Sequence, residues 1–185
     1  MAKPKRNLRL FVAIHPPQDI VASWFEALRI QKIPAHRCTP SSQVHLTLQF
    51  IGDTPSKQVN QIIESVRCAG KGQGSFELES IGMIGLPERG KKRLVAVETN
   101  RPPALLELKR RLVSSLAQSP RLSPDDRFRP HFTLCRFREP SPLDRLQGTM
   151  LASPFRVDRF SLMRSELHSG GAEHSEVETI ELLNL

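Results

Sequence analysis

Two short stretches of the chain carry the residues best suited to chemistry. Residues 45–48 read His-Leu-Thr-Leu, and residues 131–134 read His-Phe-Thr-Leu. In each stretch a histidine and a threonine alternate with two apolar residues, which is the pattern of a half-buried β-strand. Successive side chains of a strand point to opposite faces. Each stretch is therefore expected to present its His and Thr on one face and to bury its apolar pair on the other.

Two histidines that face one another across a cleft form an acid–base pair. An unperturbed imidazole titrates at about pH 6.5, so one ring can be neutral while the other is protonated. Phosphodiester hydrolysis needs such a pair, because one group takes a proton from the attacking water and the other gives a proton to the departing oxygen. Thr47 and Thr133, each two residues after its His, could donate hydrogen bonds to the non-bridging phosphate oxygens. This chemistry requires no metal.

Other interpretations of the motifs remain open. A single strand histidine is more often an ordinary surface or core residue, and only the symmetric pair favours catalysis. A non-catalytic module that binds RNA ends in a basic cleft is the main alternative. A histidine-based metal site would lack carboxylate or Cys companions at ligand spacing. The remaining histidines have no comparable context and are expected to be structural or exposed: His15, His36, His168 and His174.

Composition and charge narrow the class of protein. The 185 residues include 27 Lys and Arg against 19 Asp and Glu, a formal net charge of +8. This balance favours a polyanionic partner, most often nucleic acid, and one basic cluster, residues 127–138, surrounds the second motif. No apolar run has the length of a membrane span, and the N-terminal segment does not resemble a signal peptide. Three widely spaced cysteines favour a reducing cytoplasm.

The elements that would position the motifs also repeat. Residues 9–14 and 93–98 both read as apolar strands that begin with Arg. Each is followed by a proline pair and an amphipathic helix, expected at residues 19–30 and 102–116, and then by the His-Thr strand. The sequence thus predicts one strand–helix–strand unit used twice.

The whole chain, residues 1–185, is expected to form a single bilobal domain. Its halves would comprise roughly residues 1–85 and 92–185. If the two units pack about a pseudo-two-fold axis, both His-Thr faces line one cleft. Further expected elements are a helix at residues 56–69, a strand at 76–84 and a final strand pair at 155–167 and 177–183, while residues 33–42 read as a loop.

These features resemble the 2H phosphoesterase superfamily, which is defined by two His-x-Thr-x motifs. Within it, the sequence is most similar to the RNA 2′,3′-cyclic phosphodiesterases, also called 2′-5′ RNA ligases. The resemblance covers nearly the whole chain and includes residues 9–14, 45–52 and 129–134, and Ser165-Glu166-Leu167 followed by glycines. The family often has Tyr at the position aligned with His174, whereas this sequence has no Tyr.

The resemblance implies an α+β, bilobal 2H-phosphoesterase fold, with two antiparallel sheets around a central cleft and helices outside. It implies hydrolysis of terminal 2′,3′-cyclic phosphates to 2′-phosphomonoesters, with a reverse reaction that joins RNA ends through a 2′-5′ bond. His45 would be the proton donor and His131 the proton acceptor, with Thr47 and Thr133 binding the substrate. The substrates would be RNA ends or small nucleotides with a cyclic phosphate. No cofactor, metal or membrane is implied, and we expect a cytoplasmic monomer.

Arg136 is a candidate phosphate ligand by the same resemblance. It lies five residues after His131, so a regular strand would point it to the opposite face. It could reach the cleft only where the strand ends or bulges. Arg127 and Arg129 are alternative ligands.

Three other residues are expected near the cleft. Gln49 and Cys135 lie four residues after their respective histidines, so a regular strand would place both on the histidine face, at the cleft edge. Phe11 could stack on a base, although a core position is more usual for Phe in an apolar strand.

Overall fold

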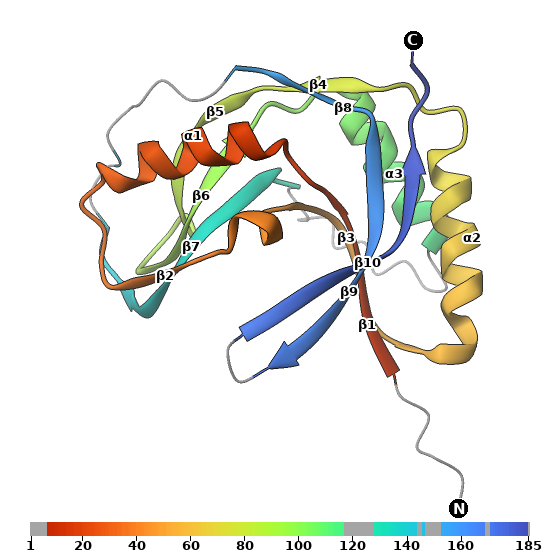
Figure 1. The fold of residues 1–185 in the computed structure, drawn as a ribbon, viewed down its shortest axis with the longest axis horizontal. Helices are drawn as coiled ribbons and strands as arrows, with labels where there is room; N and C mark the ends of the chain where they lie inside the picture. The colour runs from red at the N-terminus through yellow and green to blue at the C-terminus, as the bar shows by residue number, and fades with distance from the viewer. Residues whose placement is uncertain (1–6, 117–127, 144–145, 147–152, 169–170, 185) are drawn as a thin grey trace, which may run out of the picture.

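The computed structural model describes residues 7–116, 128–143, 146, 153–168 and 171–184. Within these residues it contains an eight-stranded antiparallel sheet, a two-stranded sheet and three α-helices (Figure 1). The helices are α1 (Gln18–Arg29), α2 (Val59–Gly70) and α3 (Pro103–Leu116), with short 3-10 helices η1 (Ser41–Gln43) and η2 (Ser56–Gln58). The strands are β1 (Asn7–Ile14), β2 (His36–Cys38), β3 (Leu46–Pro55), β4 (Phe76–Leu78), β5 (Ser80–Leu86), β6 (Lys92–Thr99), β7 (His131–Ser141), β8 (Phe155–Val157), β9 (Arg159–His168) and β10 (Gly171–Glu181).

The large sheet consists of two halves. Its order is β10-β9-β1-β3-β7-β6-β5, and β2 pairs with β7 beside this path. The halves meet at the inner strands β3 and β7, whose register pairs Leu46 with Phe132. These are the second residues of the two His-Thr stretches, so the repeated motifs lie at the junction. The predicted α+β fold is confirmed. The two predicted antiparallel sheets are the two halves of the large sheet, joined by the Leu46–Phe132 pair.

The predicted repeat is visible in the order of the strands. β1 pairs with β3 and β6 pairs with β7, so each motif strand lies beside the apolar strand of its own unit. The predicted helices of the two units, α1 and α3, begin and end within one residue of the expected positions. Each helix begins after a proline, whose restricted φ suits the first helical turn.

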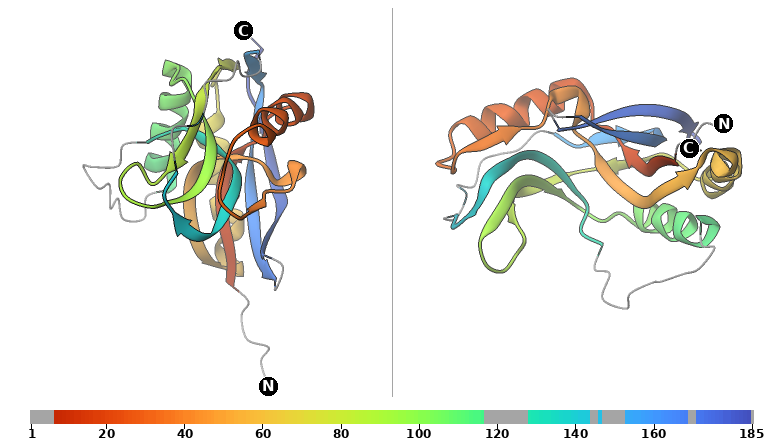
Figure 2. Two further views of the ribbon diagram at one scale, coloured as in Figure 1. Left: turned by 90° about the vertical axis from the view of Figure 1, so that its left-hand side faces the viewer. Right: turned by 90° about the horizontal axis from the view of Figure 1, so that it is seen from below.

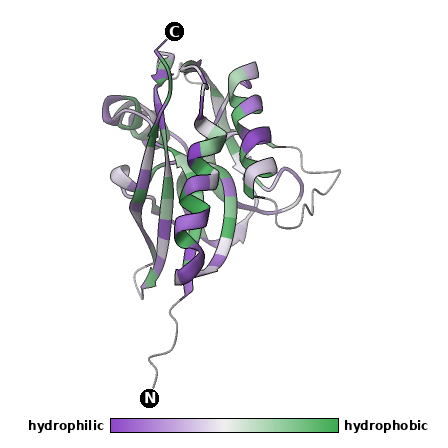
Figure 3. Ribbon diagram, turned by 90° about the vertical axis from the view of Figure 1, so that its right-hand side faces the viewer, coloured by the Kyte–Doolittle hydropathy of each residue, from purple (hydrophilic) through white to green (hydrophobic). Residues whose placement is uncertain are grey.

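The helix of each unit covers the motif strand of the other unit. In Figures 1 and 2, α1 lies over the β5-β6-β7 half, whereas α2 and α3 lie side by side on the β1-β3 half. Trp24 of α1 is fully buried, with its ring centroid 4.9 Å from that of Phe132 in β7. Lys109 of α3 donates a hydrogen bond to Gln49 of β3 at 2.6 Å. Both α2 and α3 are banded with hydrophilic and hydrophobic residues in Figure 3, as expected for helices that bury one face.

Several segments differ from the sequence prediction. β10 begins at Gly171, ahead of the predicted start at residue 177, because an edge strand open to solvent needs no apolar alternation. β2 lies inside the predicted loop of residues 33–42 and is too short to produce a pattern. The single strand predicted at residues 76–84 is two strands in different sheets, β4 and β5, and the single strand predicted at residues 155–167 is likewise β8 and β9. Among the described residues, no helix has the length and apolar character needed to cross a membrane.

Candidate active site

The two motifs run antiparallel at the junction of the halves. Extending the Leu46–Phe132 register by one residue each way sets His45 across from Thr133 and Thr47 across from His131. Opposite residues of antiparallel strands share a face, and diagonal neighbours lie about 7–8 Å apart. The two His and two Thr therefore gather on one face of the junction, termed the motif face, with the histidines diagonal to one another. Leu46 and Phe132 are fully buried on the other face.

Each histidine ring is held by the backbone just before it. The Nδ1 atom of His45 lies 2.8 Å from the carbonyl oxygen of Gln43, and the Nδ1 atom of His131 lies 2.8 Å from that of Arg129. A neutral ring in this position donates its Nδ1–H to the carbonyl, which leaves Nε2 as the proton acceptor. Because both halves make the same Nδ1 hydrogen bond, Nε2 is the nitrogen of each ring that can exchange a proton with a substrate.

A β-bulge in β3 follows the first motif. Thr47 and Gln49 face consecutive residues of β1, so Leu48 between them has no partner. A bulge shifts the alternation of the side chains beyond it. Gln49 therefore points away from His45, and its Oε1 accepts the hydrogen bond from Lys109 of α3. The prediction that Gln49 lies at the cleft edge on the histidine face is wrong for this reason.

A second bulge occupies the equivalent place in β7. Thr133 and Cys135 face consecutive residues of β6, and Leu134 between them is unpaired. Leu134 and Cys135 are consecutive and both fully buried, so they lie on the same core side. The prediction of a cleft-edge Cys135 is therefore wrong. Beyond the bulge the alternation is restored with opposite phase, which returns Arg136 to the face of His131.

The repeated bulge brings the fifth residue after each histidine to the motif face. This residue is Phe50 in the first half and Arg136 in the second. Arg136 was expected to reach the cleft only if its strand ended or bulged, and the bulge at Leu134 meets this requirement. The sequence reasoning missed Phe50, although the equivalence with Arg136 in the repeat could have identified it. Phe50 is 71% exposed, and its ring centroid lies 6.3 Å from that of its cross-strand partner Phe11.

Aromatic rings surround His45. Its ring centroid lies 5.0 Å from that of Phe11, 5.1 Å from that of His174 in an edge contact, and 6.0 Å from that of His15. His15 is exposed, as predicted. His174 lies beside the first motif because β9 pairs with β1 and β10 pairs with β9. Phe11 is 3% exposed and packs in a small apolar cluster, so the core alternative for Phe11 holds.

The backbone of His174 is hydrogen-bonded to Gln43, two residues before His45. The Gln43 side chain accepts a hydrogen bond from the His174 amide at 2.8 Å and donates one to the His174 carbonyl at 3.2 Å. His36 and His168 have the structural or exposed character that was predicted. The Nδ1 atom of His36 bonds the Pro34 carbonyl, and His168 is an exposed residue of β9.

Arg129 is engaged by carboxylates. It forms a bidentate pair with Glu98, with Nε–Oε1 at 2.6 Å and Nη2–Oε2 at 2.8 Å, and it also bonds Glu88. Glu98 faces His131 across β6 and β7, and the Arg129 guanidinium lowers the pKa of Glu98. Arg129 therefore helps to hold the second motif in place rather than standing free for a ligand. Arg127, the other alternative to Arg136, lies outside the described residues.

The family model described as the 2′-5′ RNA ligase superfamily matches residues 16–169. The chain belongs to this superfamily. A curated relative, the RNA 2′,3′-cyclic phosphodiesterase of Thermus thermophilus, is 27% identical over 181 residues, which cover 95% of this chain and 90% of the relative. The predicted 2H phosphoesterase membership is thus confirmed.

Solved structures show the same fold. A Thermus thermophilus crystal structure aligns with a TM-score of 0.83 and 24% identity, over 95% of this chain and 98% of that chain. The crystal structure of E. coli LigT complexed with 3′-AMP aligns with a TM-score of 0.79 and 24% identity, over 96% of this chain and 99% of that chain. The overall fold is therefore the one found in these solved structures.

Burial controls the protonation of the first histidine of this superfamily member. The pKa of His45 is lowered to about 4, mainly by burial and also by the charges of His174, His15 and Arg136, whereas the bond to the Gln43 carbonyl opposes the shift. The effect of Arg136 also places its charge close enough to be felt at His45. The free protein thus holds His45 as a neutral ring at neutral pH.

This pKa predicts how stability depends on pH. In the unfolded chain His45 has a pKa of about 6.5, so between about pH 6.5 and pH 4 the unfolded state binds a proton that the folded state does not. Stability is therefore lost as the pH falls through this window and is unaffected above it. At pH 5 the loss due to His45 alone is about 2 kcal/mol.

The substitution His45→Gln should remove this part of the pH dependence. The measurement is the free energy of urea unfolding at about pH 7.5 and about pH 5. The difference between the two pH values should be smaller for His45→Gln than for the unsubstituted protein. The same substitution at the exposed His168 serves as the control and should leave the difference unchanged. An unchanged difference in His45→Gln would contradict the assignment.

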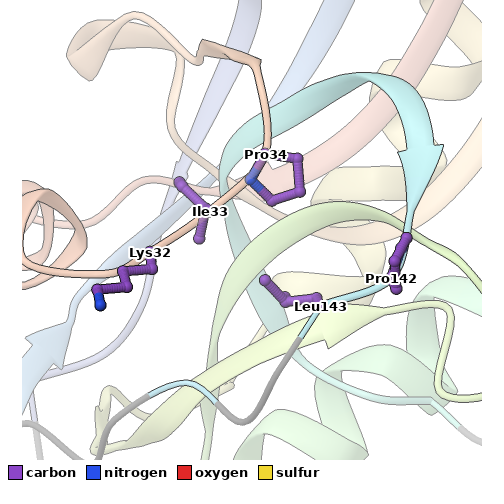
Figure 4. A pocket seen from close by; sticks show the side chains of 5 residues that line it. All are labelled: Lys32, Ile33, Pro34, Pro142 and Leu143. Atoms are coloured by element: carbon purple, nitrogen blue, oxygen red, sulfur yellow. The ribbon is translucent and has the colours of Figure 1, made fainter.

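The superfamily member has a separate hollow away from the motif residues. Lys32, Ile33, Pro34, Pro142 and Leu143 line it (Figure 4). These residues precede β2 and follow β7, at the opposite end of β7 from His131. None of the predicted site residues takes part.

Within the described part of the chain, no three His, Cys, Asp or Glu side chains are grouped so that they could hold a metal ion.

Proposed function

We propose that this superfamily member is an RNA 2′,3′-cyclic phosphodiesterase that hydrolyses terminal 2′,3′-cyclic phosphates to 2′-phosphomonoesters. One observation carries the proposal: His45 and His131 lie diagonal to one another at the residue pair that joins the two halves, each with Nδ1 held by a carbonyl. The name of the Thermus thermophilus relative supports the substrate class. Because one chain supplies both histidines, we expect the monomer to be active.

The reaction needs one proton taken and one proton given. His131 Nε2 takes a proton from water as the water oxygen attacks phosphorus. The bond from phosphorus to the 3′ oxygen breaks, and His45 gives its Nε2 proton to that oxygen. The product carries a 2′-phosphate and a free 3′-hydroxyl, and proton exchange with solvent restores both rings. The hydroxyls of Thr47 and Thr133 donate hydrogen bonds to the non-bridging oxygens, where negative charge gathers in the transition state.

The donor role of His45 requires a charged ring. The buried ring is neutral in the free protein, because its pKa is about 4. A phosphate anion bound beside the ring favours the charged form and raises this pKa. Substrate binding therefore loads His45 with the proton that the departing oxygen needs. Without the anion the ring stays uncharged, which avoids a buried cation in the resting protein.

Two further side chains suit the rest of the substrate. Arg136 supplies a positive charge on the motif face, where it can pair with a phosphate oxygen. Phe50 offers an exposed aromatic ring beside the first motif, and such rings stack on bases of single-stranded nucleic acid. The terminal nucleotide would thus have its phosphate between the histidines and its base on the β3 side. The reverse reaction, with a 5′-hydroxyl in place of water, would form a 2′-5′ bond.

Phosphorus NMR of a 2′,3′-cyclic nucleotide incubated with the protein and EDTA tests the proposal. The cyclic phosphate resonance should be replaced by that of a 2′-phosphomonoester at a rate that EDTA does not change. A 3′-phosphomonoester as the product would contradict the assigned departing oxygen. Salt-sensitive RNA binding without any turnover would instead indicate a non-catalytic RNA-end-binding module.

A further inference from the structure

Arg37 lies beside Arg136 on the motif face. The short strand β2 pairs with β7, and its register sets Arg37 directly across from Arg136. Cross-strand partners share a face. Because the bulge returns Arg136 to the motif face, Arg37 lies on that face as well. A loop was predicted here, so the sequence alone did not suggest this position.

The two arginines form an uncompensated pair of like charges. No residue that the structure describes forms an ion pair with Arg37 or Arg136. Other arginines of the chain are paired with carboxylates, among them Arg67 and Arg129. Two cations on one face that no described carboxylate neutralises are typical of a binding site for anions.

The guanidinium of Arg37 is seated against the start of β10. A Cβ atom added at Gly171 would lie 3.0 Å from Arg37 Nη1 and 3.5 Å from its Cζ, so the guanidinium lies close against the backbone of this glycine. Gly171 also has a φ of 122°, which favours glycine. Arg37 therefore reaches from β2, on the β7 half, to β10, on the β1 half. Its charge therefore lies at the edge of the motif face, where β10 begins.

The positions of the two arginines suit two successive phosphates. Neighbouring strands lie about 4.8 Å apart, so the backbones of Arg37 and Arg136 are adjacent but their charges need not meet at one point. The charge of Arg136 is felt at His45, whereas the guanidinium of Arg37 lies at Gly171. One arginine thus serves the phosphate between the histidines, and the other serves an anion further along the face.

We propose that Arg37 binds the phosphodiester preceding the terminal nucleotide, so that the protein selects RNA ends over free cyclic mononucleotides. The inference rests on the proposed function, because it assumes that the terminal cyclic phosphate lies between His45 and His131. A cyclic mononucleotide has one phosphate and leaves Arg37 unused. A dinucleotide that ends in a cyclic phosphate supplies the second anion, and a charged hydrogen bond to it is worth about tenfold in affinity or more.

The test is the ratio of kcat/KM for a dinucleotide with a terminal 2′,3′-cyclic phosphate to kcat/KM for a cyclic mononucleotide. The wild-type ratio should be about ten or more, and Arg37→Gln should bring it close to one. Arg37→Lys keeps the charge and should restore part of the ratio, which a merely structural role would not do. Arg136→Gln should lower both values together, because it removes the contact to the shared phosphate. Arg29→Gln, an exposed α1 control, should change neither.

Salt dependence gives a second readout. On the dinucleotide, the slope of log kcat/KM against log salt should be shallower by about 0.7 in Arg37→Gln, the value for one phosphate contact to a single strand. A wild-type ratio near one, or an unchanged ratio in Arg37→Gln, would overturn the inference and leave the proposed function standing. Absence of turnover of both substrates by the wild type would overturn the proposed function and this inference with it.

Discussion

Substitution of His45 or His131 by alanine is expected to lower kcat/KM for a 2′,3′-cyclic nucleotide by about 10²–10⁴-fold. This is the usual contribution of a positioned acid or base. Both rings act in one proton-transfer sequence, so the double substitution should cost little more than either single one. The exposed His168, changed to alanine, provides a matched control that should keep full activity. Retained turnover in both single variants would remove the acid–base pair from the mechanism.

The two histidines can be distinguished by the leaving group. The 3′ oxygen of ribose is a poor leaving group and needs the proton from His45, whereas 4-nitrophenolate leaves without one. With bis(4-nitrophenyl) phosphate as the substrate, His45→Ala should recover most of its lost activity relative to wild type, and His131→Ala should not. The opposite pattern would reverse the assigned roles. The motif geometry alone does not show which histidine is the proton donor, because both Nδ1 atoms make the same bond to a carbonyl at 2.8 Å.

The second large effect is expected on stability. Phe132 is fully buried, pairs with Leu46 at the junction, and packs against Trp24 of α1 and Phe155 of β8. Phe132→Ala should therefore destabilise the fold by about 3–5 kcal/mol, because it removes a large buried ring and leaves a cavity. The measurement is the free energy of urea unfolding at about pH 7.5.

Phe50 offers the matched control for this experiment. It is the same residue type and lies on the inner strand of the other half, but it is 71% exposed. Phe50→Ala should change the unfolding free energy by no more than about 0.5–1 kcal/mol. The two variants should also differ in function, since Phe50 faces the proposed base site and Phe132 faces the core. A similar loss of stability in both would contradict the view that Phe132 fastens the two halves together.

The paired motifs and the repeated strand–helix–strand unit could be predicted because they are local patterns. His and Thr at i and i+2 share a face whatever else the chain does, provided that the segment is a strand. The apolar spacing of α1 and α3 likewise depends on residues within a few turns, and both helices lie within one residue of the expected bounds. The family resemblance rests on these same local features, and the family model confirms it.

The residues around the histidines depended on register, which is set by partners distant in sequence. The bulges at Leu48 and Leu134 cannot be read from alternation, because each arises from how its strand pairs with β1 or β6. They moved Gln49 and Cys135 off the motif face and brought Phe50 and Arg136 onto it.

Tertiary pairing also assembled groups that no local pattern connects. The pairing of β9 with β1 and of β10 with β9 brought His174 to His45, and the pairing of β2 with β7 set Arg37 across from Arg136. By itself, then, the sequence determined that each of the two histidines lies on a half-buried strand within a strand–helix–strand unit that is used twice. The tertiary structure decided which side chains surround them, because pairing between strands selects the face on which every later residue lies.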